Sequence, residues 1–254
     1  MKQQSESLVS LVTVVLNDPE GLELTLNSIV SQNFKNKQIV VIDGGSEQET
    51  LDIIHAYKDK IDYWSSAPDE GIYDAMNKGI RQVKGDWLQF LNAGDAFFDR
   101  NSLKQIVSGM DEQYSFAYSD VFYEDLDGQR FLSPQKPLFR FGIFTSIHHQ
   151  ATFYNVKKLG VLLQFDTRYE ISADAALLLD IHFVDKKKCE KKIDKALVVY
   201  KMGGYSERIF SVFFSERRLQ FKEKLKNPFS FLLNNINLLR QEMKFKRKLK
   251  KEKK

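Results

Sequence analysis

Two carboxylates in this sequence come directly after short apolar runs. Asp43 follows residues 38–42, and Asp95 closes the tetrapeptide 92–95, which follows the aromatic-rich run 87–91. In open α/β sheets ligands bind outside the carboxyl ends of the strands, so a carboxylate there is placed to hold a metal ion or a ligand hydroxyl. The alternative for 92–95 is a polar turn in which Asp95 caps the next helix.

The elements that position these carboxylates alternate in type along the chain. Continuous β-branched or apolar runs are typical of strands covered on both faces, and apolar residues three and four apart are typical of helices. The predicted strands are 10–16, 38–42, 61–64 and 87–91, and the predicted helices are 20–33, 47–57 and 72–82. This alternation predicts a parallel sheet with right-handed crossovers and helices on its faces.

Two common phosphate-binding loops are missing from the sequence. There is no G-x-G-x-x-G after the first predicted strand and no G-x-x-x-x-G-K-[ST] anywhere. This argues against dinucleotide and P-loop sites. A divalent cation held by a carboxylate is the other way to neutralise phosphates, because Mg²⁺ or Mn²⁺ takes one or two carboxylates together with phosphate oxygens and waters.

The composition is that of an ordinary globular protein, with 43% hydrophobic and 28% charged residues in a chain of 254. Cys189 is the single cysteine, and we see neither an apolar signal segment nor a run of the ~18–20 apolar residues that span a bilayer, so we expect a cytoplasmic protein. Residues 240–254 hold nine Lys or Arg and two acidic residues, which leaves −3 of the net +4 for the other 239 residues. Because the basic residues belong to the tail, the sequence argues against a nucleic-acid-binding protein.

Three segments carry a resemblance to a known family: TVVLN at 13–17, IVVIDGGSEQET at 39–50 and NKGIRQVKGDWLQFLNAGD at 77–95. They resemble the inverting family-2 glycosyltransferases of GT-A fold, above all the bacterial enzymes that build capsule, exopolysaccharide and O-antigen. The resemblance runs over residues 10–206. It implies an α/β fold, a Rossmann-like, mostly parallel sheet flanked by helices.

The resemblance also implies a division of the chain. Residues 1–206 would form the GT-A domain, with a nucleotide-binding half over about 8–98 and an acceptor half over about 99–206. For the acceptor half, the pattern predicts a helix over 102–110, a strand over 116–119, a hairpin joining 121–124 to 130–132, and a returning strand over 196–201. The glycine-containing loop 202–206 has the freedom to fold over a diphosphate.

Site residues follow from the family's motifs, position by position. In the family an Asp that heads a helix is the catalytic base, and Asp174, before the apolar helical segment 175–183, matches it. The alternative is a carboxylate favoured by the helix dipole. The motif that binds metal and ribose falls on 92–95, where this chain keeps only the carboxylate of Asp95, so Asp95 is the predicted ligand of Mn²⁺ or Mg²⁺.

The remaining predicted site residues lie in the donor and sugar pockets. Adjacent histidines on an extended segment, as we expect for 147–153, point to opposite faces, so only one faces a given ligand; the alternative is a surface or core-edge imidazole. Asp69 has a competing role as a cap before the helix at 72–82. The predicted nucleotide-binding residues are Thr13, Asn17, Asp43 and Asp69, and the predicted acceptor or donor-sugar pocket holds Asn92, His148, His149 and Gln150.

The predicted reaction transfers a sugar from a nucleotide-sugar donor, UDP-linked, to a glycan or lipid-linked acceptor with inversion, in cell-surface polysaccharide biosynthesis. Two alternatives stay open. A sugar-phosphate nucleotidyltransferase would have a Gly- and Arg-rich phosphate loop where this chain has residues 16–19. A non-catalytic module of the same fold would bind nucleotide or glycan without turnover.

The C-terminal extension, 207–254, is predicted to be helical, amphipathic and basic. Apolar residues recur at mostly helical spacing: Phe229, Phe231, Leu232, Leu233, Ile236, Leu239, Met243 and Phe245. Such helices lie in the headgroup plane of anionic membranes. We therefore expect 228–254 to attach the protein peripherally to the inner face of the cell membrane; the alternative is that the apolar stripe packs on the domain.

Overall fold

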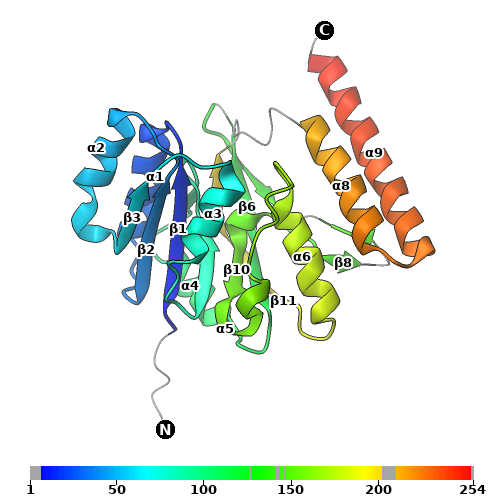
Figure 1. The fold of residues 1–254 in the computed structure, drawn as a ribbon, viewed down its shortest axis with the longest axis horizontal. Coiled ribbons are helices and arrows are strands. Elements are labelled where there is room, and N and C mark those ends of the chain that lie inside the picture. The colour runs from blue at the N-terminus through cyan, green and yellow to red at the C-terminus, as the bar shows by residue number, and fades with distance from the viewer. Residues whose placement is uncertain (1–6, 126, 141–142, 146, 202–209, 253–254) are drawn as a thin grey trace.

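The computed structural model describes residues 7–125, 127–140, 143–145, 147–201 and 210–252. Among these residues nine strands form one sheet in the order β3-β2-β1-β4-β10-β6-β11-β5, with β7 paired to β6, and helices lie on both faces (Figure 1). The strands β1, β2, β3 and β4 run parallel, and β10 joins β4 antiparallel. The predicted α/β architecture, a mostly parallel sheet flanked by helices, is confirmed.

The first half follows the predicted alternation closely. Its strands are β1 (Val9–Val15), β2 (Lys37–Asp43), β3 (Tyr63–Ser66) and β4 (Trp87–Phe90), and its helices are α1 (Pro19–Val30), α2 (Gln48–Ala56) and α3 (Ile72–Ile80), with a 3-10 turn at Lys58–Lys60. Asp18 caps α1, because its carboxylate accepts from the Gly21 N–H at 2.9 Å. Helix α3 approaches β1 closely: a Cβ on Gly79 would lie 2.5 Å from Val12 Cγ1.

The second half has more short elements than we predicted. They are β5 (Ala96–Phe97), α4 (Ser102–Gly109), β6 (Phe116–Glu124), β7 (Arg130–Ser133), β8 (Phe139–Arg140), β9 (Ile143–Phe144), β10 (Thr152–Asn155), α5 (Val156–Leu159), α6 (Ala173–Val184) and β11 (Glu190–Lys201), with 3-10 turns at His149–Ala151 and Gly160–Leu162. The strand at 116–119 and the first arm of the hairpin are one strand, β6. The chain stays extended there because β11 pairs with β6 along its length.

Each face of the sheet carries its own apolar core. Alternate residues of β1 face opposite ways, since side chains in a strand have a period of two. Val12 and Val14 join Met76 of α3 and Leu178 of α6 on one face. The other face holds Val9, Leu11, Leu22, Leu26, Leu103 and Ile106, from β1, α1 and α4.

Helices α8 (Phe210–Lys224) and α9 (Pro228–Glu252) pack side by side against the α6 side of the molecule (Figure 1). They belong to the core, because Phe214, Phe221, Leu225 and Leu238 are buried in the same apolar cluster as α6. The loop predicted at 202–206 and the predicted boundary at residue 206 lie outside the described residues. No helix in the described parts of the chain is long and apolar enough to cross a membrane.

Candidate functional site

The ends of β1, β2 and β4 lie at one edge of the sheet, because the three strands are parallel neighbours. Asp43 is the last residue of β2, and Asn92 to Asp95 form a turn just after β4. Gly94 has φ of 95°, a backbone conformation that favours glycine, and its N–H donates to the Gly21 carbonyl of α1 at 3.0 Å. The first helix thereby holds the turn that carries Asp95.

Asp43 is buried, and its two carboxylate oxygens differ in their hydrogen bonding. Oδ2 accepts from the N–H of Gly45 at 3.1 Å, the N–H of Ser46 at 2.9 Å and the hydroxyl of Ser66 at 2.5 Å. Oδ1 has no partner among the described residues. A buried carboxylate oxygen without a donor is costly, so this atom is poised to accept from a ligand N–H or hydroxyl.

The loops after β1 and β3 bring two further predicted residues toward Asp43. Asn17, at φ of 51°, accepts from the Glu47 N–H through its side-chain oxygen at 2.8 Å. Asp69 lies against Gly44, since a Cβ on that glycine would meet Asp69 Oδ2 at 2.5 Å. The structure therefore gathers three of the four residues predicted to bind nucleotide; their role stays a prediction.

The fourth, Thr13, has a different environment. Its side chain is fully buried within the sheet, and its hydroxyl donates to the Leu91 carbonyl at 2.9 Å. This bond joins β1 to the end of β4. The Thr13 hydroxyl is thus engaged within the sheet, and a nucleotide contact at this residue stays a prediction.

Asp95 is almost fully buried, and burial raises its pKa to about 7. The charge of His149, the N–H of Lys201 and the amide of Gln150 partly offset this rise, because each favours the ionised form. Asn92 begins the same turn, and its buried side-chain oxygen has no hydrogen-bond partner among the described residues. A hard cation bound by Asp95 would favour the ionised carboxylate, and the Asn92 oxygen is a second candidate ligand.

This donor set fits a divalent cation that completes its shell with phosphate oxygens and waters. The described residues include no group of three or more His, Cys, Asp or Glu side chains that could enclose a metal by themselves. A cation at Asp95 would therefore depend on a phosphate-bearing ligand.

His149 connects this turn to the predicted base. Its Nε2 lies 3.2 Å from the Asn92 Nδ2, and its Nδ1 lies 3.5 Å from the Asp174 Oδ2. The other oxygen of Asp174 accepts from the Tyr73 hydroxyl at 3.2 Å. Side chains from the turn after β4, from α3, from the 3-10 turn before β10 and from α6 thus converge on one place.

Asp174 sits in the first turn of α6, as predicted. Burial acts to raise its pKa, but the hydrogen bond and charge of His149, the Ala175 N–H and the Tyr73 hydroxyl outweigh burial, and the pKa lies below its usual value. The carboxyl is therefore ionised at neutral pH. An ionised carboxylate beside the carboxyl edge of the sheet can accept a proton from a bound hydroxyl.

The prediction of an extended segment through both histidines was wrong. Residues His149–Ala151 form a 3-10 turn, which sends the two rings to separate partners. His148 Nε2 lies 2.6 Å from the Tyr123 hydroxyl, and burial lowers the pKa of His148 to about 4, so this ring is neutral. The turn also directs the Gln150 amide toward Asp95.

Tyr73 is a site residue that the sequence did not single out. It falls at helical spacing with Ile72, Met76 and Ile80, which is the pattern of an ordinary core position. Burial and then the negative charge of Asp174 raise its pKa well above the usual value, so its hydroxyl remains a donor. No local signal marks Tyr73, because its partner lies 101 residues away.

Comparisons with known proteins found a matching family and several relatives. The family described as Glycosyl transferase family 2 matches residues 10–167. A PGL/p-HBAD biosynthesis glycosyltransferase of Mycobacterium bovis is 31% identical over 175 residues, which cover 66% of each chain. An uncharacterized glycosyltransferase of Mycobacterium tuberculosis is 30% identical over 183 residues, or 69% of each chain. This chain thus spans about two thirds of the length of these relatives.

Two solved structures share the fold. The S. aureus protein TarS, residues 1–349 in complex with UDP, superposes with a TM-score of 0.65 at 17% identity, covering 91% of this chain and 68% of that TarS fragment. Mannosyltransferase PcManGT from Pyrobaculum calidifontis, in complex with GDP-Man and Mn²⁺, gives a TM-score of 0.67 at 14% identity, covering 90% of this chain and 68% of PcManGT.

Proposed function

Because this chain belongs to glycosyl transferase family 2 and has the GT-A fold, we propose that it transfers a sugar from a nucleotide-sugar donor to a hydroxyl of a glycan or lipid-linked acceptor, with inversion at the anomeric carbon. One observation carries the proposal: the contacts from Asn92 through His149 to Asp174 join the strand-end carboxylate site to a second, ionised carboxylate. The proposed base and the strand ends proposed to bind the donor phosphates then lie within one site.

The proposed reaction is a single displacement. Asp174 accepts the proton of the acceptor hydroxyl, and the oxygen attacks the anomeric carbon while the bond from that carbon to the diphosphate oxygen breaks. The Tyr73 hydroxyl and the His149 ring hold the Asp174 carboxylate in place. No covalent enzyme intermediate is required.

Asp95, with the Asn92 side-chain oxygen beside it, would hold Mn²⁺ or Mg²⁺. A bound divalent cation supplies charge stabilisation for the departing diphosphate. The Mn²⁺ in the PcManGT complex supports such a role in a protein of this fold.

We assign the donor nucleotide to the pocket around Asp43, Asn17 and Asp69, with Thr13 beneath it. The complexes of TarS with UDP and with UDP-GlcNAc favour a UDP-linked sugar, whereas the GDP-Man complex of PcManGT shows that the fold also accepts a guanine nucleotide. Screening nucleotide sugars by thermal shift, with and without Mn²⁺, separates these cases, because a ligand that binds the native state raises its melting temperature.

The same screen, followed by a turnover assay, tests the two alternatives. A nucleotidyltransferase would release pyrophosphate from a nucleoside triphosphate, and a binding module would be stabilised by the donor without consuming it. The loop after β1 argues against a nucleotidyltransferase. It is not a Gly- and Arg-rich phosphate loop, and Asp18 within it caps α1.

Replacing Asp43 with Asn is expected to weaken binding of the nucleotide alone by about 10-fold, because the loss of a hydrogen bond to a charged group costs about 1.5–3 kcal/mol. An amide keeps an acceptor for the Gly45 and Ser46 N–H groups but presents a donor where the free oxygen lies. Calorimetric titration with nucleotide and with intact donor measures the change.

Ser66→Ala is the matched control, since it removes a bond to Oδ2 and leaves the free Oδ1 in place. We expect the two ligands to lose affinity equally in Asp43→Asn and little in Ser66→Ala. A loss confined to the intact donor would contradict a role in holding base or ribose.

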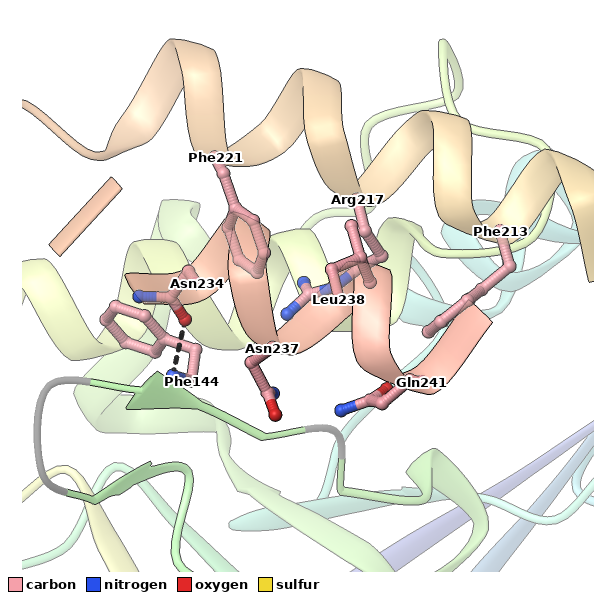
Figure 2. Close-up of a pocket in the computed structure, with 8 residues that line it drawn as sticks. All are labelled: Phe144, Phe213, Arg217, Phe221, Asn234, Asn237, Leu238 and Gln241. Atoms are coloured by element: carbon pink, nitrogen blue, oxygen red, sulfur yellow. Dashed lines mark hydrogen bonds between the residues drawn. The ribbon is translucent and has the colours of Figure 1, made fainter. Parts of the chain in front are cut away.

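We also propose that α9 attaches the protein peripherally to the cytoplasmic face of the membrane, where a lipid-linked acceptor would lie. The inner face of α9 is buried: Asn234 accepts from the Phe144 N–H at 2.8 Å and Leu238 joins the core, as Figure 2 shows. An outer stripe remains exposed at alternating steps of three and four residues: Phe229, Leu232, Ile236, Leu239 and Met243.

This outer stripe is the reason for preferring a membrane to packing on the domain. Leu232 and Met243 are 56% and 52% exposed. Phe231 is exposed as well, whereas Leu233 is half-buried and the side chain of Phe245 lies outside the described residues. The sequence from 240 onward is strongly basic, and each Lys or Arg near an anionic leaflet contributes about 1 kcal/mol of attraction. Like charges would oppose pairing of this helix with a second copy.

Flotation with liposomes tests this assignment. The full chain should float with anionic vesicles at low salt, float less at high salt, and stay at the bottom with neutral vesicles. The triple variant Leu232→Gln, Ile236→Gln, Leu239→Gln should lose flotation while keeping its melting temperature, because all three side chains are exposed. Equal flotation of variant and wild type, or dimerisation of the wild type through this stripe, would remove the membrane role.

A further inference from the structure

The carboxylate of Glu216 in α8 accepts hydrogen bonds from the three residues that precede α6. One oxygen accepts from the N–H of Glu170, and the other accepts from the N–H of Ile171 at 3.3 Å and the hydroxyl of Ser172 at 2.6 Å. The side chain is 9% exposed. A buried charge is retained at low cost only where donors satisfy it, and the donors found among the described residues are two backbone N–H groups and one hydroxyl of the segment 170–172.

Ser172 occupies the N-cap position of α6, yet its side chain does not cap the helix. Its hydroxyl is engaged by α8 instead: it donates to Glu216, and Gln220 donates to its oxygen at 2.8 Å and to its carbonyl at 2.9 Å. Ser172 and Gln220 are both fully buried. The residue two positions before Asp174 is therefore fixed by α8.

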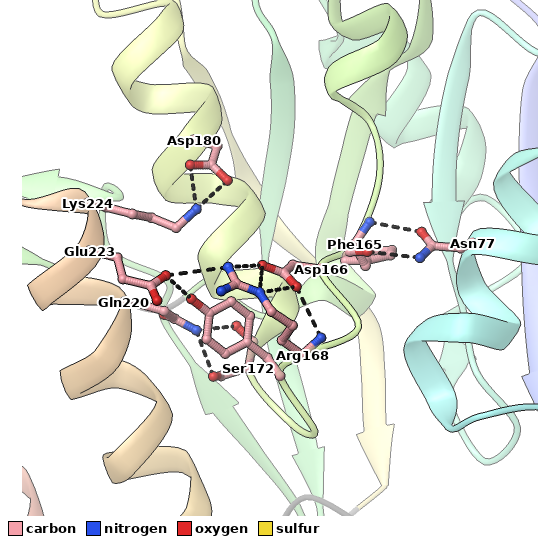
Figure 3. A network of polar contacts seen from close by, with 10 residues as sticks. Asn77, Phe165, Asp166, Arg168, Ser172, Asp180, Gln220, Glu223 and Lys224 are labelled. Carbon is pink, nitrogen blue, oxygen red and sulfur yellow. Dashed lines mark hydrogen bonds and ion pairs between the residues drawn. The ribbon is translucent and has the colours of Figure 1, made fainter.

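The start of the same segment is held from the opposite side (Figure 3). Asn77 of α3 bonds both the N–H and the carbonyl of Phe165 at 2.9 Å. Further along, the Tyr169 hydroxyl donates to Glu223 of α8 at 3.1 Å. Residues 165–172 thus run between two anchors, and Asp174 follows the second.

We propose that Glu216 is a positioning residue for Asp174: by fixing the backbone of 170–172 it sets where α6 begins and where the Asp174 carboxylate lies. This inference rests on the proposed role of Asp174 as the base. It assigns the C-terminal extension a part in the reaction, because Glu216 and Gln220 both belong to α8.

The choice of residue supports positioning over simple stability. An apolar side chain in this buried position would fill the same space without the desolvation cost of a carboxylate. The carboxylate fixes the orientation of the segment 170–172, since two backbone N–H groups and one hydroxyl must point at its two oxygens.

The test compares Glu216→Gln with Lys224→Gln in the full chain. Lys224 is the matched control, because it also joins α8 to α6, through an ion pair with Asp180, but it contacts none of 170–172. We expect Glu216→Gln to lower kcat by about 10-fold with KM for the donor within about 2-fold, since a misplacement of ~1 Å costs up to ~10²-fold in rate. Lys224→Gln should keep the wild-type kcat.

Ser172→Ala is a second variant, which keeps Glu216 and removes the hydroxyl between it and Gln220. We expect its kcat to fall about 3-fold, in the same direction as Glu216→Gln. Melting temperatures are measured for all three variants, and rates are taken where each is folded. A wild-type kcat in both Glu216→Gln and Ser172→Ala, or an equal fall in Lys224→Gln, would overturn the inference.

Asp174→Asn is run in parallel to separate this inference from the proposed function. If Asp174→Asn is inactive and neither Glu216→Gln nor Ser172→Ala is impaired, only the positioning role fails. If Asp174→Asn turns over at the wild-type rate, the base assignment itself fails, and the positioning inference fails with it.

Discussion

Asp174→Asn is expected to lower turnover by about 10²-fold or more, with nucleotide affinity nearly unchanged. The amide has the shape of the carboxylate and can still accept from the Tyr73 hydroxyl, so the site should keep its geometry. What it loses is the ability to accept a proton from the acceptor. Steady-state kinetics with saturating donor and acceptor measure the effect, and titration with the nucleotide provides the binding control.

The neighbour His149 helps to interpret this variant. Because His149 lowers the pKa of Asp174, its ring is coupled to the base, but it also lies beside Asn92. His149→Gln should therefore show a smaller loss of turnover than Asp174→Asn. If Asp174→Asn retained the wild-type rate, or if His149→Gln were the more severely impaired, Asp174 would not be the base.

Asp95→Asn is expected to abolish the metal-dependent part of donor binding and to lower kcat/KM by about 10²-fold or more, since a cation on a departing phosphate contributes several kcal/mol. Asn92 alone offers only an amide oxygen and cannot replace the carboxylate. Donor titrations with Mn²⁺, with Mg²⁺ and with chelator measure the loss. If neither Mn²⁺ nor Mg²⁺ changed the donor affinity of the wild type, the protein would be metal-independent and the assignment of Asp95 would be wrong.

Stability against pH provides a readout of Asp95 without any ligand. Burial raises its pKa from 3.8 to about 7, so between these values the folded protein binds more protons than the unfolded chain. This contribution to stability is present at low pH and is lost as pH rises toward 7. The Asp95→Asn variant, measured with chelator present, has no carboxyl to deprotonate and should not lose this stability. The difference between its melting temperature and that of the wild type should therefore shift in favour of the variant from pH 4 to about pH 7.

The parallel half of the fold could be predicted because its signals are local. The β-branched run of β1 and the apolar run of β2 are buried along their lengths, and each ends where a polar loop begins. Asp43 and Asp95 could be placed at strand ends for the same reason. The alternation of strands and helices then predicted a parallel sheet with right-handed crossovers, although it did not fix the order of the strands.

The second half could not be predicted as well, because long-range pairing decides its structure. Nothing local joins 116–119 to 121–124; β11 does, from some 75 residues further along the chain. The 3-10 turn at His149 likewise depends on neighbours, among them Gln89, whose amide donates to the Gln150 carbonyl at 2.6 Å. The sequence pattern showed only that the segment was apolar at its ends.

Only part of the candidate site could be predicted from the sequence, because some of its contacts join residues that are far apart in the chain. Asp174 could be named only through the family's motif, since a carboxylate in the first turn of a helix is common without any catalytic role. Tyr73 and Glu216 were missed because their partners are far apart in sequence and their types are ordinary for helices. Contacts of this kind become visible only when the chain is folded.

The sheet order has a consequence for how the chain is made. Strand β4 pairs with β1 on one side, and on its other side with β10, whose residues Thr152–Asn155 leave the ribosome much later. Until then the nascent β1–β4 half has an open edge of unpaired backbone groups, which is a template for unwanted association. Strand β11 and helix α8 are made later still, so the half that holds Asp43 and Asp95 is synthesised well before the helix that contacts the start of α6. A chain released early would carry the β1–β4 half with an exposed strand edge, and it is this intermediate that a chaperone would have to shield.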